Sequence, residues 1–253
     1  MTLTAPNFRL DGRRALVTGA GRGIGRAAAV ALASAGASVT LCARSEDDLQ
    51  AVAREIAKDG GTADYFVADV TDPRSFEEGL GQRPGYDILV NSAGMNIPKP
   101  LVELSDEEVE QIFNLNVRSI FRTTRFVLKG MLERGRGGSI IQISSQMGLV
   151  GSPGRTAYCA SKHALEGMTK ALAWEVGESG IRVNTICPTF IETDFTAKMF
   201  AKPGFHDWVT SRIALRRPGR TDEIMGAVVF LASDASSLMT GQALVLDGGW
   251  TAV

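Results

Sequence analysis

The 253-residue sequence has little of what marks several common protein classes. Its three cysteines, Cys42, Cys159 and Cys187, are widely spaced and form neither a C-x-x-C pair nor a Cys/His ligand pattern, so we expect free thiols. No apolar run approaches the roughly 18 residues that a spanning helix needs. The N-terminus also has no apolar run of signal-peptide length. The sequence therefore predicts a cytoplasmic protein with no membrane partner.

An excess of charge is missing too. The 27 Lys and Arg residues nearly cancel the 28 Asp and Glu residues, which gives a formal net charge of -1. Without a basic surplus, the composition predicts no nucleic-acid partner. No repeat, low-complexity stretch or Pro/Ser-rich linker divides the chain, so residues 1–253 are expected to form a single domain.

What is present is an alternation of short β-branched apolar runs with longer helical patterns, which is typical of βαβ units around a parallel sheet. The runs have few polar residues on either face, so both faces of the sheet should be covered. The sequence predicts an α/β fold of the Rossmann type, a doubly wound seven-stranded parallel sheet with helices on both faces. We expect strands at 15–18, 38–41, 64–67, 87–90, 139–144, 182–187 and 243–247, and helices at 24–35, 46–58, 106–134, 158–179 and 221–232.

The first expected strand runs into a glycine-rich turn, TGAGRGIG at residues 18–25, which opens an alanine-rich helix. Free backbone N–H groups and the positive end of the helix dipole favour an anion at such a turn, and the missing side chains let it come close. The spacing of Gly19, Gly23 and Gly25 departs from the common G-x-G-x-x-G. Its place directly after the first strand nevertheless predicts a site for the pyrophosphate of a dinucleotide.

The tip of the second strand normally carries the group that meets the adenosine ribose, often an acid that binds the 2′-hydroxyl. Here the strand ends at Ala43 and Arg44. A guanidinium pairs bidentately with a phosphate, and Arg22 would add a second positive charge. This pattern favours NADP(H) over NAD(H), although the acidic run at 46–48 leaves NAD(H) open.

A candidate catalytic group follows the fifth expected strand. Ser144 ends that strand, Ser145 follows it, and Tyr158 lies thirteen residues beyond Ser145. Tyr158 and Lys162 are an i, i+4 pair on one helical face, so an ammonium can sit near the phenol. A nearby cation favours the charged phenolate, and it would lower the phenol's ordinary pKa of about 10 toward the range of efficient proton exchange. The neighbouring His163 points about 100° away around the helix and is predicted to be a packing or surface residue.

Taken together and in this order, the motifs resemble the short-chain dehydrogenase/reductase family over essentially the whole chain. The matching positions are TGAGRGIG at 18–25, Asp69-Val70, Asn91-Ser92-Ala93-Gly94, Asn116, Ser145, Tyr158 with Lys162, Pro188 with Ile191 and Thr193, and Asp247-Gly248-Gly249. Two positions depart from the family pattern, Ser92 in place of a frequent asparagine and Thr189 in place of the usual glycine after Pro188.

The resemblance implies four catalytic residues and no metal. Tyr158 would be the general acid/base, and Ser145, favoured over Ser144 by the spacing to Tyr158, would orient and polarise the substrate oxygen. Lys162 would bind the nicotinamide ribose and lower the phenol's pKa, and Asn116 would hold a water for proton relay. The implied cofactor-binding residues are Gly19, Arg22, Gly23, Ile24, Gly25, Arg44, Asp69, Val70, Asn91, Ala93, Gly94, Tyr158, Lys162, Pro188, Ile191 and Thr193.

The resemblance also implies a function: hydride transfer between a nicotinamide cofactor and an alcohol or ketone, in a homotetramer. A polyol, sugar acid or other small hydroxy or keto compound is the expected substrate. The alternative is a 3-oxoacyl thioester on acyl carrier protein, and a non-catalytic dinucleotide-binding regulator is a remote third reading. A substrate lid is expected at about 190–215. Its aromatic residues Phe195, Phe200, Phe205 and Trp208 would either wall the pocket or anchor the lid, and His206 would either meet substrate or remain solvated.

Overall fold

The computed structural model describes residues 5–81 and 83–252, and a seven-stranded parallel sheet forms its centre. The strands stand in the order β3-β2-β1-β4-β5-β6-β7, which confirms the predicted Rossmann-type fold. The first strand, β1, lies inside the sheet. The strands β2 and β3 are added on one side of it and β4 to β7 on the other, so the direction in which strands are added reverses between β1 and β4. Their carboxyl ends therefore border the crevice where such sheets bind ligands. The strands are β1 (Arg14–Thr18), β2 (Ser38–Ala43), β3 (Thr62–Val67), β4 (Ile88–Asn91), β5 (Gly138–Ile143), β6 (Ile181–Pro188) and β7 (Ala243–Leu246).

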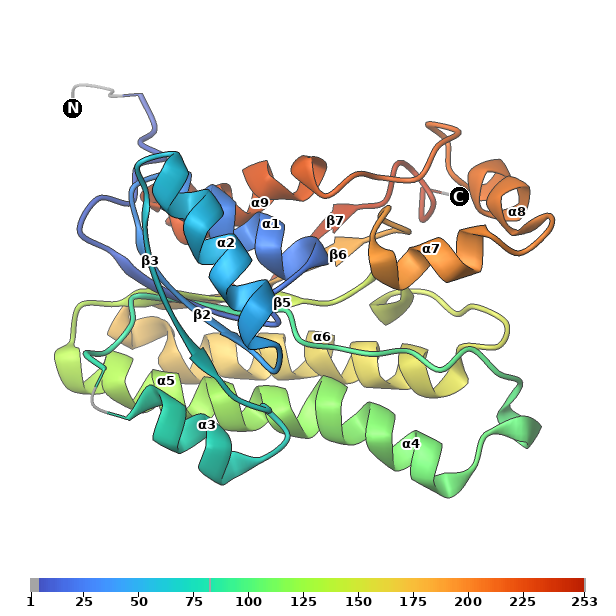
Figure 1. The fold of residues 1–253 in the computed structure, drawn as a ribbon, viewed down its shortest axis with the longest axis horizontal. Helices are drawn as coiled ribbons and strands as arrows, with labels where there is room; N and C mark the ends of the chain where they lie inside the picture. The colour runs from blue at the N-terminus through green and yellow to red at the C-terminus, as the bar shows by residue number, and fades with distance from the viewer. Residues whose placement is uncertain (1–4, 82, 253) are drawn as a thin grey trace.

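Helices cover both faces of the sheet, as Figure 1 shows. One layer holds α1 (Gly23–Ser34), α2 (Glu46–Lys58) and α9 (Asp222–Ala232), and the other holds α3 (Pro73–Leu80), α4 (Asp106–Phe113), α5 (Ser119–Arg134) and α6 (Thr156–Val176). Alternate residues of β1 serve the two layers: Ala15 and Val17 pack in the core under α1, α2 and α9, whereas Leu16 packs in the core under α3, α5 and α6. Short 3-10 turns occupy Leu101–Glu103, Gln146–Gly148, Gly177–Ser179 and Asp234–Ser236.

Three helices were not predicted. Helix α3 begins at Pro73, and the Asp72 side chain caps it by accepting from the Arg74 N–H at 3.0 Å. An acidic N-cap followed by proline is a helix-start signal that the sequence offers. The other two, α7 (Asp194–Phe200) and α8 (Phe205–Arg212), form the segment predicted as a lid and lie beyond the carboxyl ends of the strands.

The expected single helix at 106–134 is interrupted. Residues Asn114–Arg118 form one π-helical turn that joins α4 to α5 without a break in the chain direction. The wider turn contains Asn116, whose side chain is fully buried. Single π turns of this kind are frequent at functional sites.

The glycine turn is built by close backbone contact, which gives a stability prediction. A Cβ on Gly25 would collide with the carbonyl oxygen of Gly19, which is backbone and cannot rotate away. Gly25→Ala should therefore lower the free energy of unfolding by about 3 kcal/mol, as overpacked interiors do. Gly226→Ala is the matched control, because nothing lies within 4 Å of a Cβ there and α9 would gain up to about 1 kcal/mol. Urea denaturation measures both, and equal stabilities of the two variants would contradict the steric argument.

Candidate active site

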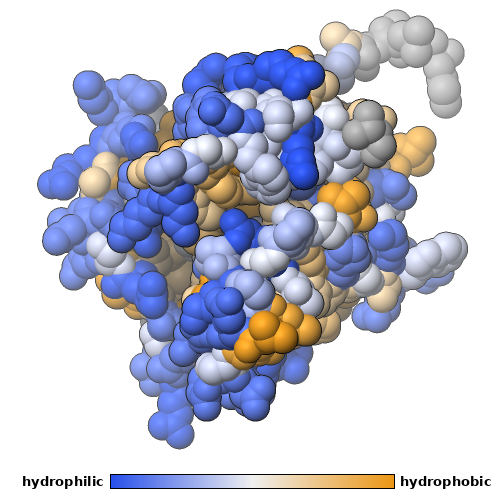
Figure 2. Space-filling view, turned by 90° about the vertical axis from the view of Figure 1, so that its right-hand side faces the viewer, coloured by the Kyte–Doolittle hydropathy of each residue, from blue (hydrophilic) through white to orange (hydrophobic). Residues whose placement is uncertain are grey.

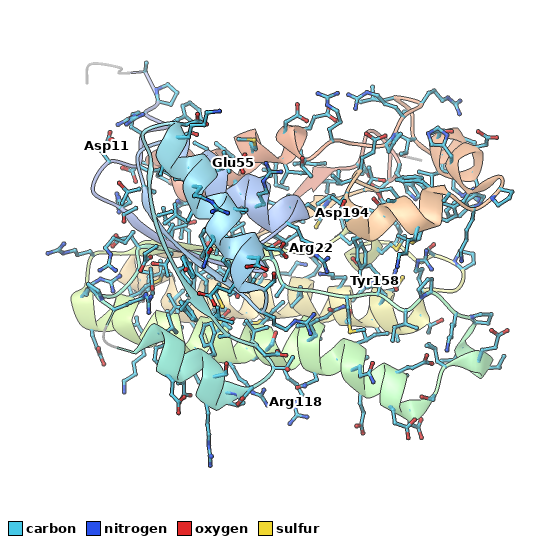
Figure 3. All side chains as sticks on the ribbon, in the orientation of Figure 1. Asp11, Arg22, Glu55, Arg118, Tyr158 and Asp194 are labelled. Carbon is cyan, nitrogen blue, oxygen red and sulfur yellow. The ribbon has the colours of Figure 1, made fainter. Side chains whose placement is uncertain are left out.

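The predicted catalytic residues converge at the carboxyl ends of β4 and β5. Ser145 follows β5, Tyr158 and Lys162 lie in the first two turns of α6, and Asn116 comes from the π turn between α4 and α5. Tyr158, Arg22 and Asp194 are labelled to the right of the centre in Figure 3. Figure 2 looks onto the right-hand side of that view and shows a hollow with apolar colouring at depth and a mostly hydrophilic rim.

Ser145, Tyr158 and Lys162 are brought together as the spacing predicted. The Ser145 side chain interacts with the phenol of Tyr158, and its hydroxyl also accepts from the Met147 N–H at 3.1 Å. The Lys162 ammonium lies 5.6 Å from the centre of the Tyr158 ring and donates to the Ile143 carbonyl at 2.9 Å. An ammonium has three donors, so two remain for a ligand.

Burial sets the protonation states of this group. It raises the pKa of Tyr158 to about 12, against the smaller lowering effects of Ser145 and the positive charge of Arg155. It lowers the pKa of Lys162 to about 8. Desolvation disfavours the charged form of each group, so the phenol keeps its proton at neutral pH. Lys162 is not among the groups that lower the pKa of Tyr158 in this structure, so the role implied for it remains a prediction.

Asn116 ties the loop after β4 to α6. Its Oδ1 accepts from the Met95 N–H at 2.8 Å, and its Nδ2 donates to the Met95 carbonyl at 2.9 Å and to Ser161 Oγ at 3.0 Å. A Cβ on Gly94 would stand 3.4 Å from Asn116 Oδ1 and 3.8 Å from Lys162 Nζ. The missing side chain of Gly94 therefore leaves space directly over two of the predicted catalytic residues.

The glycine turn fits a pyrophosphate. Arg22, the N-cap of α1, is extended and makes no side-chain cap, and the first turn carries no acid. In contrast, Ser45 caps α2, and Ser105 forms a full capping box with Glu108 at α4. The first N–H groups of α1 thus have no side-chain acceptor, and the helix dipole favours an anion there.

The tip of β2 fits an additional phosphate. The Arg44 side chain is 76% exposed, and its Nη1 lies 3.9 Å from Asp69 Oδ2, a loose contact that leaves the guanidinium free to bind. Asp69 is held by Thr71, which donates its N–H at 2.8 Å and its hydroxyl at 2.7 Å to Oδ1, and the next residue, Val70, is buried. Arg44 and Asp69 therefore lie side by side where the predicted adenosine site begins.

The segment around Asn91 forms the floor of the crevice. The Asn91 amide is buried and bonded internally, donating to Thr124 Oγ1 at 3.0 Å and Gln142 Oε1 at 2.9 Å and accepting from Thr123 Oγ1 at 2.6 Å. These bonds hold β4 to β5 and α5. The backbone of Ala93 packs against the glycine turn after β1, because a Cβ on Gly19 would lie 2.8 Å from the Ala93 nitrogen.

The lid is fixed by aromatic packing. Phe200, Phe205 and Trp208 surround Phe190 with ring centres 5.6 to 6.3 Å away, so these three anchor the lid, whereas Phe195 is 52% exposed. His206 lies beside the Phe200 ring and within 3.7 Å of Asp207.

The lid begins against the glycine turn. Ile191 is buried and forms a β-bridge with Gly219. Thr193 caps α7, and its Cγ2 would touch a Cβ on Gly23 at 3.4 Å. Pro188, at the end of β6, is also buried. Pro188, Ile191 and Thr193, which the resemblance assigns to the nicotinamide end of the cofactor, therefore lie between the end of β6 and the glycine turn.

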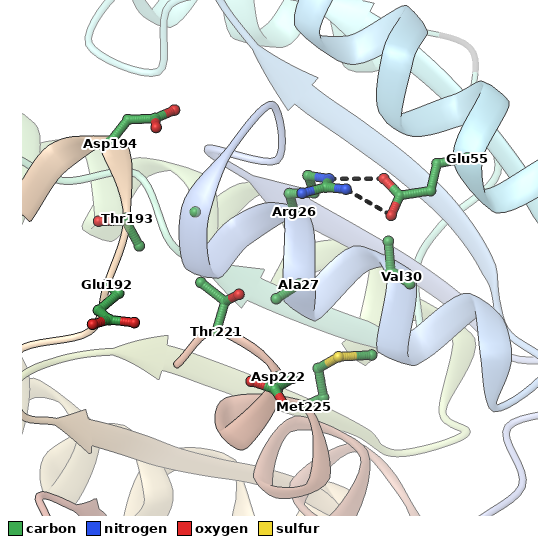
Figure 4. A pocket seen from close by; sticks show the side chains of 11 residues that line it. Arg26, Ala27, Val30, Glu55, Glu192, Thr193, Asp194, Thr221, Asp222 and Met225 are labelled. Atoms are coloured by element: carbon green, nitrogen blue, oxygen red, sulfur yellow. Dashed lines mark hydrogen bonds and ion pairs between the residues drawn. The ribbon is translucent and has the colours of Figure 1, made fainter. Parts of the chain in front are cut away.

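A cavity of about 340 Å³ lies between α1, α9 and the start of the lid, and its lining includes Gly23 and Thr193 of the predicted cofactor site (Figure 4). Its wall carries Glu192, Asp194 and Asp222, and the Arg26–Glu55 ion pair at 2.7 Å closes one side. None of the four predicted catalytic residues lines it, so the cavity is not the catalytic pocket.

Three residues near the site were not anticipated from the sequence. Two of them are Thr189, which departs from the family pattern, and Gln146. The Thr189 hydroxyl and the Gln146 amide are buried without a hydrogen-bond partner among the described residues. The position of Gln146 directly after Ser145 is the sequence feature that could have identified it as a residue near the site. The third is Arg155, a buried guanidinium three residues before Tyr158, whose burial depends on the lid and could not be read from local sequence.

Within the part of the chain that the structure describes, no helix is long and apolar enough to cross a membrane. The same residues contain no group of three or more His, Cys, Asp or Glu side chains placed to hold a metal ion. All three cysteines are free and buried.

A glycine turn at the switch point of a parallel sheet and a Ser, Tyr and Lys group at the same edge define a class of dinucleotide-dependent oxidoreductases. Comparison with known proteins agrees, since a family model described as enoyl-(acyl carrier protein) reductase matches residues 19–251. The chain belongs to the short-chain dehydrogenase/reductase family and is an NAD(P)-dependent oxidoreductase.

Its similar relatives act on different substrates. D-erythrulose reductase of Gallus gallus is 36% identical over 245 residues, covering 97% of this chain and 98% of the relative. The 3-oxoacyl-acyl-carrier-protein reductase FabG of Thermotoga maritima is 39% identical over 246 residues, covering 96% and 99%. The crystal structure of a gluconate 5-dehydrogenase from Burkholderia cenocepacia, in complex with NADP and tartrate, superposes with a TM-score of 0.92 at 35% identity and covers 98% of both chains.

Proposed function

We propose that this protein transfers a hydride between NADP(H) and a small hydroxy or keto compound of the polyol or sugar-acid type. The convergence of Ser145, Tyr158 and Lys162 beside the uncapped glycine turn carries this proposal. The sugar-related reductases and dehydrogenases among its relatives support the substrate class. The free guanidinium of Arg44 supports the preference for the cofactor with the 2′-phosphate.

In the proposed mechanism Tyr158 exchanges the proton. Its hydroxyl donates a proton to the substrate oxygen in reduction and takes it back in oxidation. Ser145, which interacts with the phenol, donates a hydrogen bond to the same oxygen and orients it. When bound, the dinucleotide supplies or accepts the hydride at its nicotinamide ring.

Lys162 and Asn116 support this exchange. Lys162 keeps one N–H on the Ile143 carbonyl, and its remaining donors would bind the nicotinamide ribose. Asn116 holds the Met95 backbone and would position a water for proton relay. The remaining predicted cofactor residues, Gly19, Arg22, Gly23, Ile24, Gly25, Asp69, Val70, Asn91, Ala93, Gly94, Pro188, Ile191 and Thr193, would form the dinucleotide site along the crevice.

A substrate panel tests the proposal. The purified protein is mixed with NADPH or NADH and offered keto sugar acids, ketoses and a 3-oxoacyl thioester, and the loss of reduced nicotinamide is followed by absorbance. We expect turnover with NADPH of a keto acid or ketose. Turnover of the thioester alone would establish the acyl-carrier alternative, and failure to bind or oxidise either cofactor would overturn the proposal.

The two reaction directions should differ in their dependence on pH. Burial raises the pKa of Tyr158 to about 12, so the proton-donating phenol is fully present at neutral pH and reduction does not gain from a higher pH. Oxidation needs the phenolate, whose fraction rises about tenfold per pH unit below that pKa. Thus kcat/KM for oxidation should climb between about pH 7 and pH 9 while kcat/KM for reduction stays level or falls. Parallel profiles in both directions would contradict the assignment of Tyr158.

We also propose a homotetramer. Phe121 and Leu132 on α5 and Trp174 on α6 are exposed, Trp174 at 90%, and a soluble monomer gains nothing from such side chains on two long helices. Sedimentation velocity would show a species of four chains, and a monomer at all concentrations would refute the assembly.

A further inference from the structure

Arg155 is a buried cation without an acidic partner. It stands directly before α6, three residues ahead of Tyr158, and is only 8% exposed. Its guanidinium makes two contacts with weak or distant acceptors, from Nη1 to the Gly154 carbonyl at 3.3 Å and from Nη2 to the thioether sulfur of Met199 at 3.5 Å. Neither acceptor is charged, and among the described residues no carboxylate pairs with it. Most of its five N–H donors therefore lack a protein acceptor.

Two other partly buried arginines of this fold have close acceptors. Arg182 donates to Ser236 Oγ at 2.7 Å and to the carbonyls of Leu231 and Ser233 at 2.9 and 3.0 Å. Arg83 pairs with Asp64 at 2.9 Å. Burying a charge without such compensation costs several kcal/mol, so Arg155 does not stabilise the fold by its charge. A ligand that supplies the missing anion would explain why the cation is there.

The position of Arg155 points to the substrate rather than to the cofactor. Met199 belongs to the lid helix α7, so the guanidinium is enclosed between the lid and the start of α6. Arg155 is also the residue directly before α6, three positions ahead of Tyr158, and its positive charge lowers the pKa of the phenol. The predicted cofactor residues Gly23 and Thr193 meet instead where the glycine turn faces the start of α7.

We propose that Arg155 is the anion-binding residue of the substrate pocket and that the natural substrate carries a carboxylate. This deepens the proposed function and rests on it: within that class, the substrate is a hydroxy or keto acid rather than a neutral polyol or an acyl thioester. A guanidinium presents a planar fork that matches a carboxylate with two parallel hydrogen bonds. Held in this way, the acid would place its hydroxyl or keto carbon at Tyr158.

The test is Arg155→Met, which keeps the volume of the side chain and removes the charge. Arg212→Met is the matched control, because Arg212 is an exposed lid cation stacked on the Trp208 ring at 4.8 Å. The probes are D-gluconate and D-glucitol, which share a carbon chain and differ in the carboxylate, each oxidised with NADP+. Tartrate, titrated calorimetrically into the enzyme with NADP+, reports anion binding without turnover.

We expect the wild-type enzyme to prefer the acid and to bind tartrate. Arg155→Met should lose at least about 30-fold in kcat/KM for gluconate, mainly through KM, and should no longer bind tartrate, while activity on glucitol changes less than about threefold. Arg212→Met should behave like the wild type. The melting temperature of Arg155→Met should equal or exceed that of the wild type, because an unpaired buried charge is removed; a purely structural arginine would give the opposite shift.

The inference fails if wild-type enzyme binds tartrate no better than Arg155→Met does, or if both proteins discriminate equally between the acid and the neutral analogue. Fluorescence titration with NADPH separates this from failure of the proposed function. An enzyme that binds NADPH and oxidises gluconate equally well with and without Arg155 would keep its proposed function, and only the inference that the substrate carboxylate binds Arg155 would be lost. An enzyme that binds no NADPH would lose both.

Discussion

Tyr158→Phe is expected to lower kcat by about 1000-fold while the Kd for NADPH changes less than about threefold. The substitution removes one oxygen and leaves the ring in the cluster with Met147, Phe190 and Val209, so the pocket and the lid stay in place. Positioned proton transfer contributes about 100- to 10,000-fold in enzymes, and the phenylalanine ring has no proton to transfer. Single-turnover rates with the best substrate of the panel and fluorescence titration of NADPH measure the two quantities.

Tyr65→Phe is the control for that experiment. The Tyr65 hydroxyl donates to Glu46 Oε1 at 3.3 Å on the surface near α2, far from the catalytic group in the sequence and in the sheet order. Its loss should leave kcat unchanged. Substantial activity in Tyr158→Phe, or an equal loss in Tyr65→Phe, would refute the assignment of Tyr158 as the acid/base.

The second large effect concerns the cofactor. Arg44→Asp should lower the ratio of kcat/KM for NADPH to that for NADH by about 100-fold or more. A charge-assisted bidentate bond to the 2′-phosphate is lost, and a carboxylate that repels the phosphate and accepts from a ribose hydroxyl takes its place. Little stability should be lost, because the contact with Asp69 is 3.9 Å long and exposed ion pairs contribute at most about 1 kcal/mol.

Arg54→Asp makes the same charge change on the exposed surface of α2 and should leave the cofactor ratio within about twofold. An unaltered ratio in Arg44→Asp would show that the 2′-phosphate is not bound at the tip of β2. Equal changes in both variants would show that the effect comes from net charge and not from a local contact.

The sheet and its glycine turn were predictable because their signals are local. A β-branched run followed by glycines at residues 18–25 specifies a strand and a tight turn whatever surrounds them, and β1 and α1 appear where expected. The convergence of Ser145, Tyr158 and Lys162 was also predictable, since two of them share a helical face and the third follows the neighbouring strand.

What could not be predicted depends on contacts between distant segments. The burial of Arg155 depends on Met199, forty-four residues away, and the division of the lid aromatics into anchors and exposed residues depends on Phe190 and Trp250. The same holds for the protonation of Tyr158: the sequence suggests a lowered pKa, whereas enclosure by the lid and α6 raises it.

The π turn at Asn114–Arg118 limits which insertions and deletions this fold can accept during evolution. One extra residue in a helical turn shifts everything after it by about 100° around the axis. Deleting a single residue there would leave α4 in place but rotate α5, so that Val127 and Met131 would turn away from the sheet and Phe121 and Phe126 would change sides. An insertion or deletion in this stretch would therefore displace the buried Asn116 and damage the packing of the helical layer together. Descendants of this sequence should tolerate length changes almost anywhere on the surface before they tolerate one here.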